Sequence, residues 1–113
     1  MPPNWRKAAV THEVVFAPEA LADLVSLYDR LAQAASPARA LAYVEQVQAY
    51  CMDFATFPER GMRRDDLRPG LRTIGYRRRV TIAFHVTAGM VAIDRILYGG
   101  RDVEALLAED GEA

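Results

Sequence analysis

The chain has 113 residues, 51% of them hydrophobic, so it can form one hydrophobic core but is too short for two comfortable domains. Its net charge of −1 argues against a protein that binds nucleic acid through its overall charge, and its single cysteine, Cys51, excludes a disulfide framework and a cysteine-based metal site. It has no signal peptide and no stretch near the ~18 apolar residues of a membrane span, so we expect a cytoplasmic protein with no membrane association.

The first predicted elements are a short strand and an amphipathic helix. Residues 12–16 are rich in β-branched and aromatic residues and are cut off by Ala17-Pro18, which favours a strand. Pro18 suits the first turn of a helix, and Glu19 and Asp23, in or near that turn, interact favourably with the helix dipole. Apolar residues then recur with helical spacing at Leu21, Leu24, Val25, Tyr28, Leu31, Ala32 and Ala35.

A second helix follows after a short link. Ser36 is a favourable N-cap and Pro37 a favourable first-turn residue, and we expect the helix to end near Phe57-Pro58. Its apolar face contains Leu41, Val44, Val47, Cys51, Phe54 and Ala55. A link this short predicts an antiparallel helical hairpin.

Three aromatic residues of the second helix, Tyr43, Tyr50 and Phe57, are spaced seven apart and flank its main apolar face. They either widen the contact with the core or form a groove for the apolar side chains of a partner. The two interpretations are compatible.

The second half of the chain predicts a loop and three strands. Residues 58–70 are rich in charge, Pro and Gly without periodicity, which indicates an exposed loop. Residues 71–74 form a brief strand, and residues 75–78 and 87–89 are the expected hairpin turns. Residues 79–86 alternate, with Val80, Ile82, Phe84 and Val86 on one face and Arg79, Thr81, Ala83 and His85 on the other.

The last predicted strand, residues 90–98, changes phase along its length. Val91 and Ile93 are in one phase, whereas Ile96 and Tyr98 are in the other. This change predicts a β-bulge near Asp94-Arg95. After Gly99-Gly100 the chain has a short helical pattern at Val103, Leu106 and Leu107 and then an acidic tail.

Arginines are concentrated in one part of the chain. Residues 60–79 contain eight arginines and two aspartates, so this segment carries +6 and the remainder −7. The three adjacent charges of Arg77, Arg78 and Arg79 repel one another, and an anionic partner would relieve the repulsion. The run Arg63-Arg64-Asp65-Asp66 either pairs internally or recognises a target.

The element order predicts an α+β fold: an N-terminal strand, then an antiparallel helical hairpin packed on a small, mainly antiparallel sheet (β-α-α-β-β-β), and a short C-terminal helical segment. We expect a single domain over residues 12–107, preceded by an extension, residues 1–11, and followed by the acidic tail, residues 108–113.

Five motifs in this order resemble the RelE/ParE superfamily of toxins from type II toxin–antitoxin systems. They are Phe16-Ala-Pro-Glu-Ala20 with Asp23, Ser36-Pro37 with Ala40, Phe57-Pro58-x-x-Gly61, Arg68-Pro-Gly-Leu-Arg72, and Ile96-Leu-Tyr-Gly-Gly-Arg-Asp102. The resemblance covers nearly the whole chain.

The resemblance implies one of two activities. RelE-like toxins are ribosome-dependent nucleases that cut mRNA with lysines and arginines of the sheet and a C-terminal tyrosine. ParE-like toxins inhibit DNA gyrase and are not known to use a nuclease site. This chain has Lys7 as its only lysine, and Leu107 stands where a RelE-like tyrosine is expected. It therefore looks closer to ParE-like plasmid-stabilisation toxins, without a catalytic site, a cofactor or a metal.

The resemblance also implies partners. We expect a hetero-oligomer with a ParD-like antitoxin, which lays a helix against the helical hairpin. The toxin is expected to associate with promoter DNA only indirectly, through the antitoxin. The residues expected to contact the antitoxin are Leu24, Tyr28, Leu31, Tyr43, Tyr50 and Phe57. The residues expected to contact the target, DNA gyrase, are Arg72, Arg77, Arg78, Arg79 and Arg101.

Two alternatives stay open. The first is an mRNA interferase that uses Arg72, Arg79, His85 and Arg101, in which His85 is the one titratable candidate because guanidinium groups stay protonated. His85 is otherwise a surface or sheet-packing histidine. The second alternative is a relic of the fold that binds its antitoxin and is not toxic.

Overall fold

The computed structural model describes residues 12–99 and 106–107, and the predicted N-terminal extension and acidic tail lie outside them. The domain boundaries expected from the sequence therefore stay predictions. The order of elements is β1 (Glu13–Phe16), α2 (Pro18–Ala34), α3 (Pro37–Met52), a 3₁₀ turn (Asp53–Ala55), β2 (Met62–Arg63), β3 (Leu71–Tyr76), β4 (Val80–Thr87) and β5 (Met90–Tyr98).

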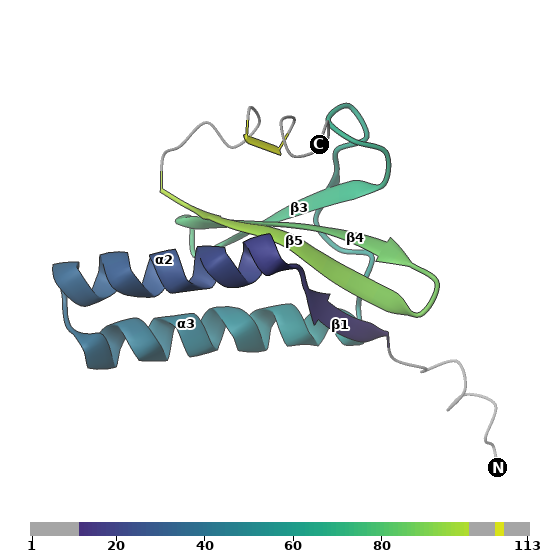
Figure 1. Ribbon diagram of the computed structural model, residues 1–113. Helices are drawn as coiled ribbons and strands as arrows, with labels where there is room; N and C mark the ends of the chain where they lie inside the picture. The colour runs from purple at the N-terminus through teal and green to yellow at the C-terminus, as the bar shows by residue number, and fades with distance from the viewer. Residues whose placement is uncertain (1–11, 100–105, 108–113) are drawn as a thin grey trace, which may run out of the picture.

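The two helices form the predicted antiparallel hairpin and lie together along one side of the sheet (Figure 1). Pro18 occupies the first turn of α2, and the Ser36 hydroxyl caps α3 by accepting the backbone N–H of Arg39 at 3.2 Å. α3 ends at Met52, earlier than predicted. The chain then tightens into the 3₁₀ turn, which brings the ring of Phe54 to 4.7 Å from that of Phe84 in the core.

The five strands form one sheet in the order β1-β5-β4-β3-β2. Among the strands that the structure describes, only β1 and β5 pair in parallel, so the expectation of a mainly antiparallel sheet in an α+β fold is confirmed. The sequence did not predict β2, because two residues carry no periodicity; Met62 and Arg63 become a strand by pairing with Thr73 and Arg72 of β3.

The predicted bulge in the last strand is confirmed. Ala83 of β4 pairs with Arg95, whereas the next residue, Phe84, pairs with Ile93, so Asp94 is the extra residue of β5. A residue in this position is unpaired in the ladder, and the strand bends there.

Both faces of the sheet are covered. On the helix-covered face, β4 contributes Val80, Ile82 and Phe84 to the main core, which contains Leu24, Leu27, Val47, Cys51, Phe54, Val91 and Ile93 from the other elements. Ala83, predicted on the opposite face, is also fully buried, in a second cluster with Leu71, Leu97 and Leu107. Within residues 12–99 and 106–107, no helix has the length and apolar character needed to span a bilayer.

Candidate functional site

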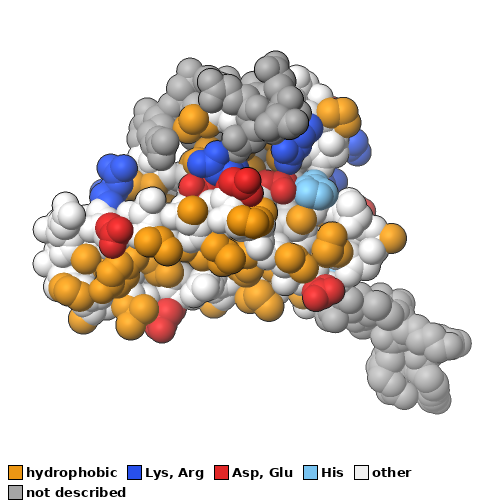
Figure 2. All heavy atoms as spheres, viewed as in Figure 1, with side chains coloured by type: hydrophobic (Ala, Val, Ile, Leu, Met, Phe, Trp, Pro, Cys, Tyr) orange, Lys and Arg blue, Asp and Glu red, His pale blue; other side chains and the backbone are white. Residues whose placement is uncertain are grey.

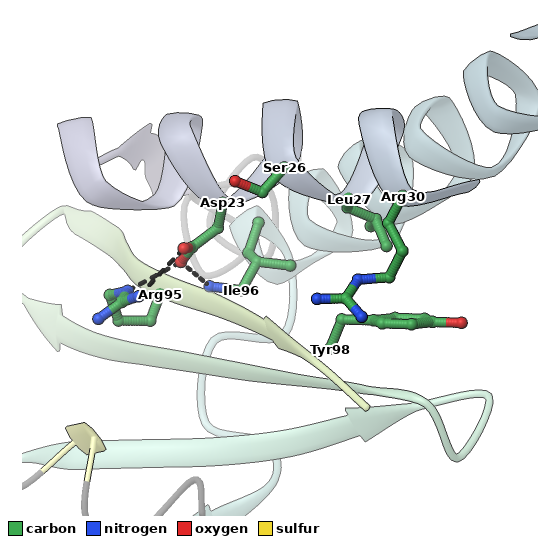
Figure 3. Close-up of a pocket in the computed structure, with 7 residues that line it drawn as sticks. All are labelled: Asp23, Ser26, Leu27, Arg30, Arg95, Ile96 and Tyr98. Atoms are coloured by element: carbon green, nitrogen blue, oxygen red, sulfur yellow. Dashed lines mark hydrogen bonds and ion pairs between the residues drawn. The ribbon is translucent and has the colours of Figure 1, made fainter. Parts of the chain in front are cut away.

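Asp23 fixes helix α2 to strand β5 (Figure 3). β1 covers β5 only as far as Ile93, so the backbone beyond the bulge has an open edge. Asp23 accepts the backbone N–H of Ile96 at 2.8 Å and two N–H groups of the Arg95 guanidinium at 2.8 and 3.1 Å. This contact joins residues 72 and 73 positions apart and sets the position of α2 relative to the end of the sheet.

At the end of β5, the aromatic residue Tyr98 contacts two arginines. The guanidinium carbon of Arg30, from α2, lies 5.4 Å from the centre of the Tyr98 ring, in cation–π geometry. Arg79 Nη1 lies 3.5 Å from the Tyr98 hydroxyl. Tyr98 thus places a helix arginine and a hairpin arginine around one aromatic ring.

The β3–β4 hairpin places two arginines in an unfavourable backbone conformation. Arg77 and Arg78 have φ angles of +53° and +63°, as at the central positions of a type I′ turn, and the N–H of Arg79 donates to the carbonyl of Tyr76 at 3.2 Å. Asn and Gly are favoured at these positions. Each arginine costs on the order of 1–2 kcal/mol in the left-handed region. Non-glycine residues held in this way cluster at functional sites.

Among the arginines that the structure describes, four form ion pairs with carboxylates: Arg63 with Asp65, Arg64 with Asp66, Arg68 with Asp94 and Arg95 with Asp23. Arg60 and Arg72 make other contacts: Arg60 lies over the ring of Phe54 at 4.8 Å, and Arg72 donates to the carbonyl of Arg60. Within residues 12–99 and 106–107, no ion pair involves the four arginines at the hairpin end. These are Arg30, Arg77, Arg78 and Arg79, which we call the hairpin surface.

The pairing in the 60–70 loop holds its carboxylates ionised. The pKa of Asp65 is lowered by the N–H of Gly70, which it accepts at 2.8 Å, and by Arg63; that of Asp66 is lowered by Arg64. Of the two interpretations of the Arg63-Arg64-Asp65-Asp66 run, the structure thus favours internal pairing.

His85 lies in a different place, on the sheet face away from the helices. Its Nδ1 is 2.7 Å from Asp94 Oδ2, which also accepts Arg68 at 2.9 Å. The bulge aims Asp94 at His85, so the predicted phase change was the signal for this pair, although the sequence did not name Asp94 as a site residue. In the same described segments, no group of three or more His, Cys, Asp or Glu could hold a metal ion.

Of the four residues named for a nuclease, the three that the structure describes do not come together. Arg72 pairs with Phe84 and therefore lies on the opposite face from His85, where its guanidinium donates to the carbonyl of Arg60 at 3.2 Å. Arg79 directly precedes β4 and His85 lies near the other end of this strand, roughly 20 Å away along the chain direction. Arg101 lies outside the described residues.

An apolar groove runs over the helical hairpin. Leu21, Leu24, Val25, Tyr28, Val44 and Gln48 line it. Figure 2 shows hydrophobic side chains gathered over the helical layer and charged ones in a band on the side of the sheet. Val25 is 61% and Leu21 48% exposed. Of the residues named for antitoxin binding, Leu24 and Tyr28 line the groove, although Leu24 is largely buried, and Leu31 packs against the core.

The three aromatic residues spaced seven apart, Tyr43, Tyr50 and Phe57, do not line this groove, and Phe57 lies beyond the end of α3. The rings of Tyr43 and Tyr50 are 6.1 and 4.8 Å from that of Tyr76 on β3, which supports the interpretation that they widen the core contact. Burial raises the pKa of Tyr43, whose hydroxyl is buried and has no hydrogen-bond partner among the residues that the structure describes. Phe57 is 66% exposed beneath the guanidinium of Arg60 at 5.8 Å.

Comparison with known proteins identifies the family. The model of the ParE toxin of type II toxin–antitoxin systems (parDE) matches residues 14–103. Comparison with curated proteins gives no significant match. Among solved structures, a chromosomal ParDE system from P. aeruginosa has a chain with the same fold, with a TM-score of 0.70 and 24% identity over 80% of this chain and 98% of that one. The family match covers most of the sequence, and the chain belongs to the ParE toxin family.

Proposed function

We propose that this chain inhibits DNA gyrase in the cytoplasm and that a ParD-like antitoxin neutralises it by binding the helical hairpin. The observation that carries the proposal is its membership of the ParE toxin family. The structure adds two separate surfaces of different chemistry, an apolar groove on the helices and the hairpin surface at the end of the sheet.

The apolar groove fits an amphipathic segment of an antitoxin. Leu21 and Val25 expose large apolar side chains one helical turn apart, and Tyr28 continues the row. A helix laid in such a groove buries apolar side chains at the same spacing. The resulting hetero-oligomer reaches promoter DNA only through its antitoxin.

The hairpin surface fits a role in binding rather than in acid–base catalysis. Cleavage of a phosphodiester needs a group that takes a proton and a group that gives one. The four arginines of the hairpin surface supply positive charge only, because their guanidinium groups stay protonated. We therefore assign this surface to contact with the gyrase complex.

A supercoiling assay tests the proposal. Purified gyrase, relaxed plasmid and ATP are incubated with the toxin alone and then with toxin and antitoxin. We expect loss of supercoiling with accumulation of cleaved plasmid, and recovery when the antitoxin is present. Unimpaired supercoiling by folded protein that stops growth in cells contradicts the proposal, and absence of any growth defect supports a non-toxic relic that only binds antitoxin.

The groove is tested by Val25→Glu, which places a charge where apolar contact is expected. Val25 is mostly exposed, so the variant should fold and still inhibit gyrase, but the antitoxin should bind it at least ~10-fold more weakly. Gln33→Glu, an exposed position outside the groove on the same helix, is the matched control. Equal neutralisation of both variants would remove the groove from the antitoxin site.

One observation favours a second candidate, a ribosome-dependent mRNA interferase. Asp94 orients His85, as a carboxylate does for a histidine that transfers protons, and Arg68 lies beside the pair. This candidate predicts that the toxin cuts mRNA on purified ribosomes and that His85→Gln ends the cleavage without loss of folding. Intact mRNA after incubation with the wild-type toxin would exclude it.

A further inference from the structure

We propose that the hairpin surface, Arg30, Arg77, Arg78 and Arg79, binds the phosphate backbone of duplex DNA. The inference deepens the proposed function and rests on it for its setting, because the duplex would be the DNA segment that gyrase holds. The toxin would then contact the DNA of the complex as well as the enzyme.

The first argument is the charge that the fold leaves without a partner. Arg63 and Arg64 have carboxylate partners two residues away, Asp65 and Asp66, so their charge is cancelled locally. The arginines of the hairpin surface have no ion pair within residues 12–99 and 106–107, and Arg77, Arg78 and Arg79 line one open hollow with Tyr98 and Gly99. A local concentration of unpaired guanidinium groups on a chain of net charge −1 marks a site for a polyanion.

The second argument is that arginines cover the aromatic rings beside the hairpin, those of Tyr76 and Tyr98. The guanidinium of Arg77 covers the ring of Tyr76 at 5.3 Å, as Arg30 covers Tyr98 at 5.4 Å. Proteins that bind single strands leave such rings free to stack on bases. Here the rings hold arginines instead, and the N–H edges of these arginines stay available for phosphate oxygens. The arrangement therefore favours the backbone of a duplex over unpaired bases.

The third argument is the backbone of the turn. Arg77 and Arg78 have positive φ angles at turn positions that favour Asn-Gly. The sequence thus keeps two guanidinium groups at the hairpin tip although the backbone conformation there disfavours arginine. A two-stranded β-ribbon is narrow enough to enter the major groove, about 12 Å wide, with phosphates on either side. The tip thus combines a suitable shape with the charge.

The experiment measures binding of the whole toxin to a fluorescently labelled duplex of about 20 base pairs by anisotropy over a series of salt concentrations. If all four arginines contact phosphates, the affinity should fall ~150-fold between about 50 and about 200 mM salt. The double variant R77N/R78G removes two contacts, so its affinity should fall only ~12-fold over the same range.

Two controls separate loss of contact from loss of structure. Asn-Gly suits the turn, so R77N/R78G should melt at the same or a higher temperature than the wild type. Arg63→Gln removes an exposed arginine outside the hairpin surface and should leave the salt dependence of DNA binding unchanged. The single variant Arg78→Gly also removes one positive charge, but at the hairpin tip, and it should reduce the salt dependence of DNA binding.

Two results would overturn the inference. The first is an unchanged salt dependence in R77N/R78G. The second is tighter binding of a single-stranded RNA or of polyglutamate than of the duplex under the same conditions. A toxin that inhibits gyrase without binding duplex DNA disproves this inference and leaves the proposed function standing. A toxin that binds the duplex through the hairpin surface but does not inhibit gyrase contradicts the proposed function and leaves the DNA-binding site standing.

Discussion

Replacing Asp23 with alanine should strongly destabilise the fold, because the Asp23 carboxylate joins α2 to β5. Asp23 and Arg95 are only 13% and 16% exposed, and the carboxylate accepts three hydrogen bonds, two from Arg95 and one from the N–H of Ile96. Alanine removes all of these contacts and leaves the partners without Asp23 as acceptor.

The magnitude follows from the groups that lose their partner. A buried backbone N–H without an acceptor costs about 1–3 kcal/mol, and removing one member of a buried ion pair costs about 3–5 kcal/mol. Arg95 is partly exposed and has a further interaction, so the lower part of these ranges applies. We expect Asp23→Ala to lower the free energy of unfolding by ~3 kcal/mol and the melting temperature by roughly 15 °C. Asp23→Asn, which keeps an acceptor for Ile96, should lose about half as much.

Urea denaturation followed by circular dichroism measures the effect. Asp29→Ala is the matched control, because Asp29 is exposed on the same helix and gains the same helix propensity on substitution; its stability should change by no more than about 0.5 kcal/mol. A loss of less than ~1 kcal/mol in Asp23→Ala, or an equal loss in Asp29→Ala, would show that this contact does not hold α2 to β5.

Further predictions concern the loop and the core. Gly61→Ala should lower the free energy of unfolding by ~2 kcal/mol in denaturant titrations, because Gly61 has a φ of +76° and the new Cβ would clash with the carbonyl of Thr73. Gly70 also has a positive φ but has open space around it, so Gly70→Ala should lower the free energy of unfolding by only ~1 kcal/mol. Asp65 has a lowered pKa, so its contribution to stability is complete above the unfolded pKa of about 4 and is lost as the pH falls through the folded value. In melts between about pH 3 and about pH 7, the difference between the wild type and Asp65→Asn should therefore shrink on acidification, and a constant difference would contradict this linkage. Burial raises the pKa of Cys51 to about 12, so a thiol reagent at neutral pH should label the protein only after denaturation; labelling of the native protein at the rate of a free thiol would refute the burial.

The sequence by itself determined the local structure of this protein. Pro18 and Ser36-Pro37 start the helices where the structure has them, because their φ preference and capping hydroxyl act within one turn. The alternation of residues 79–86 and the phase change after Ile93 gave β4 and the bulge of β5, because side-chain period is a property of the strand alone. The end of α3 was missed, since the 3₁₀ turn is stabilised by packing of Phe54 in the core.

The tertiary structure decided which charges act together. Eight arginines between residues 60 and 79 look alike in the sequence, but in the structure Arg63, Arg64 and Arg68 pair with carboxylates. Arg60 and Arg72 contact an aromatic ring and a carbonyl, and the hairpin arginines have no carboxylate partner among the described residues. Arg30, distant in sequence, joins them only because the anchoring of α2 on β5 brings it over Tyr98. The contacts of Arg68 with Asp94 and of Arg30 with Tyr98 depend on the approach of segments far apart in the chain, and no local pattern encodes the distance between two such segments.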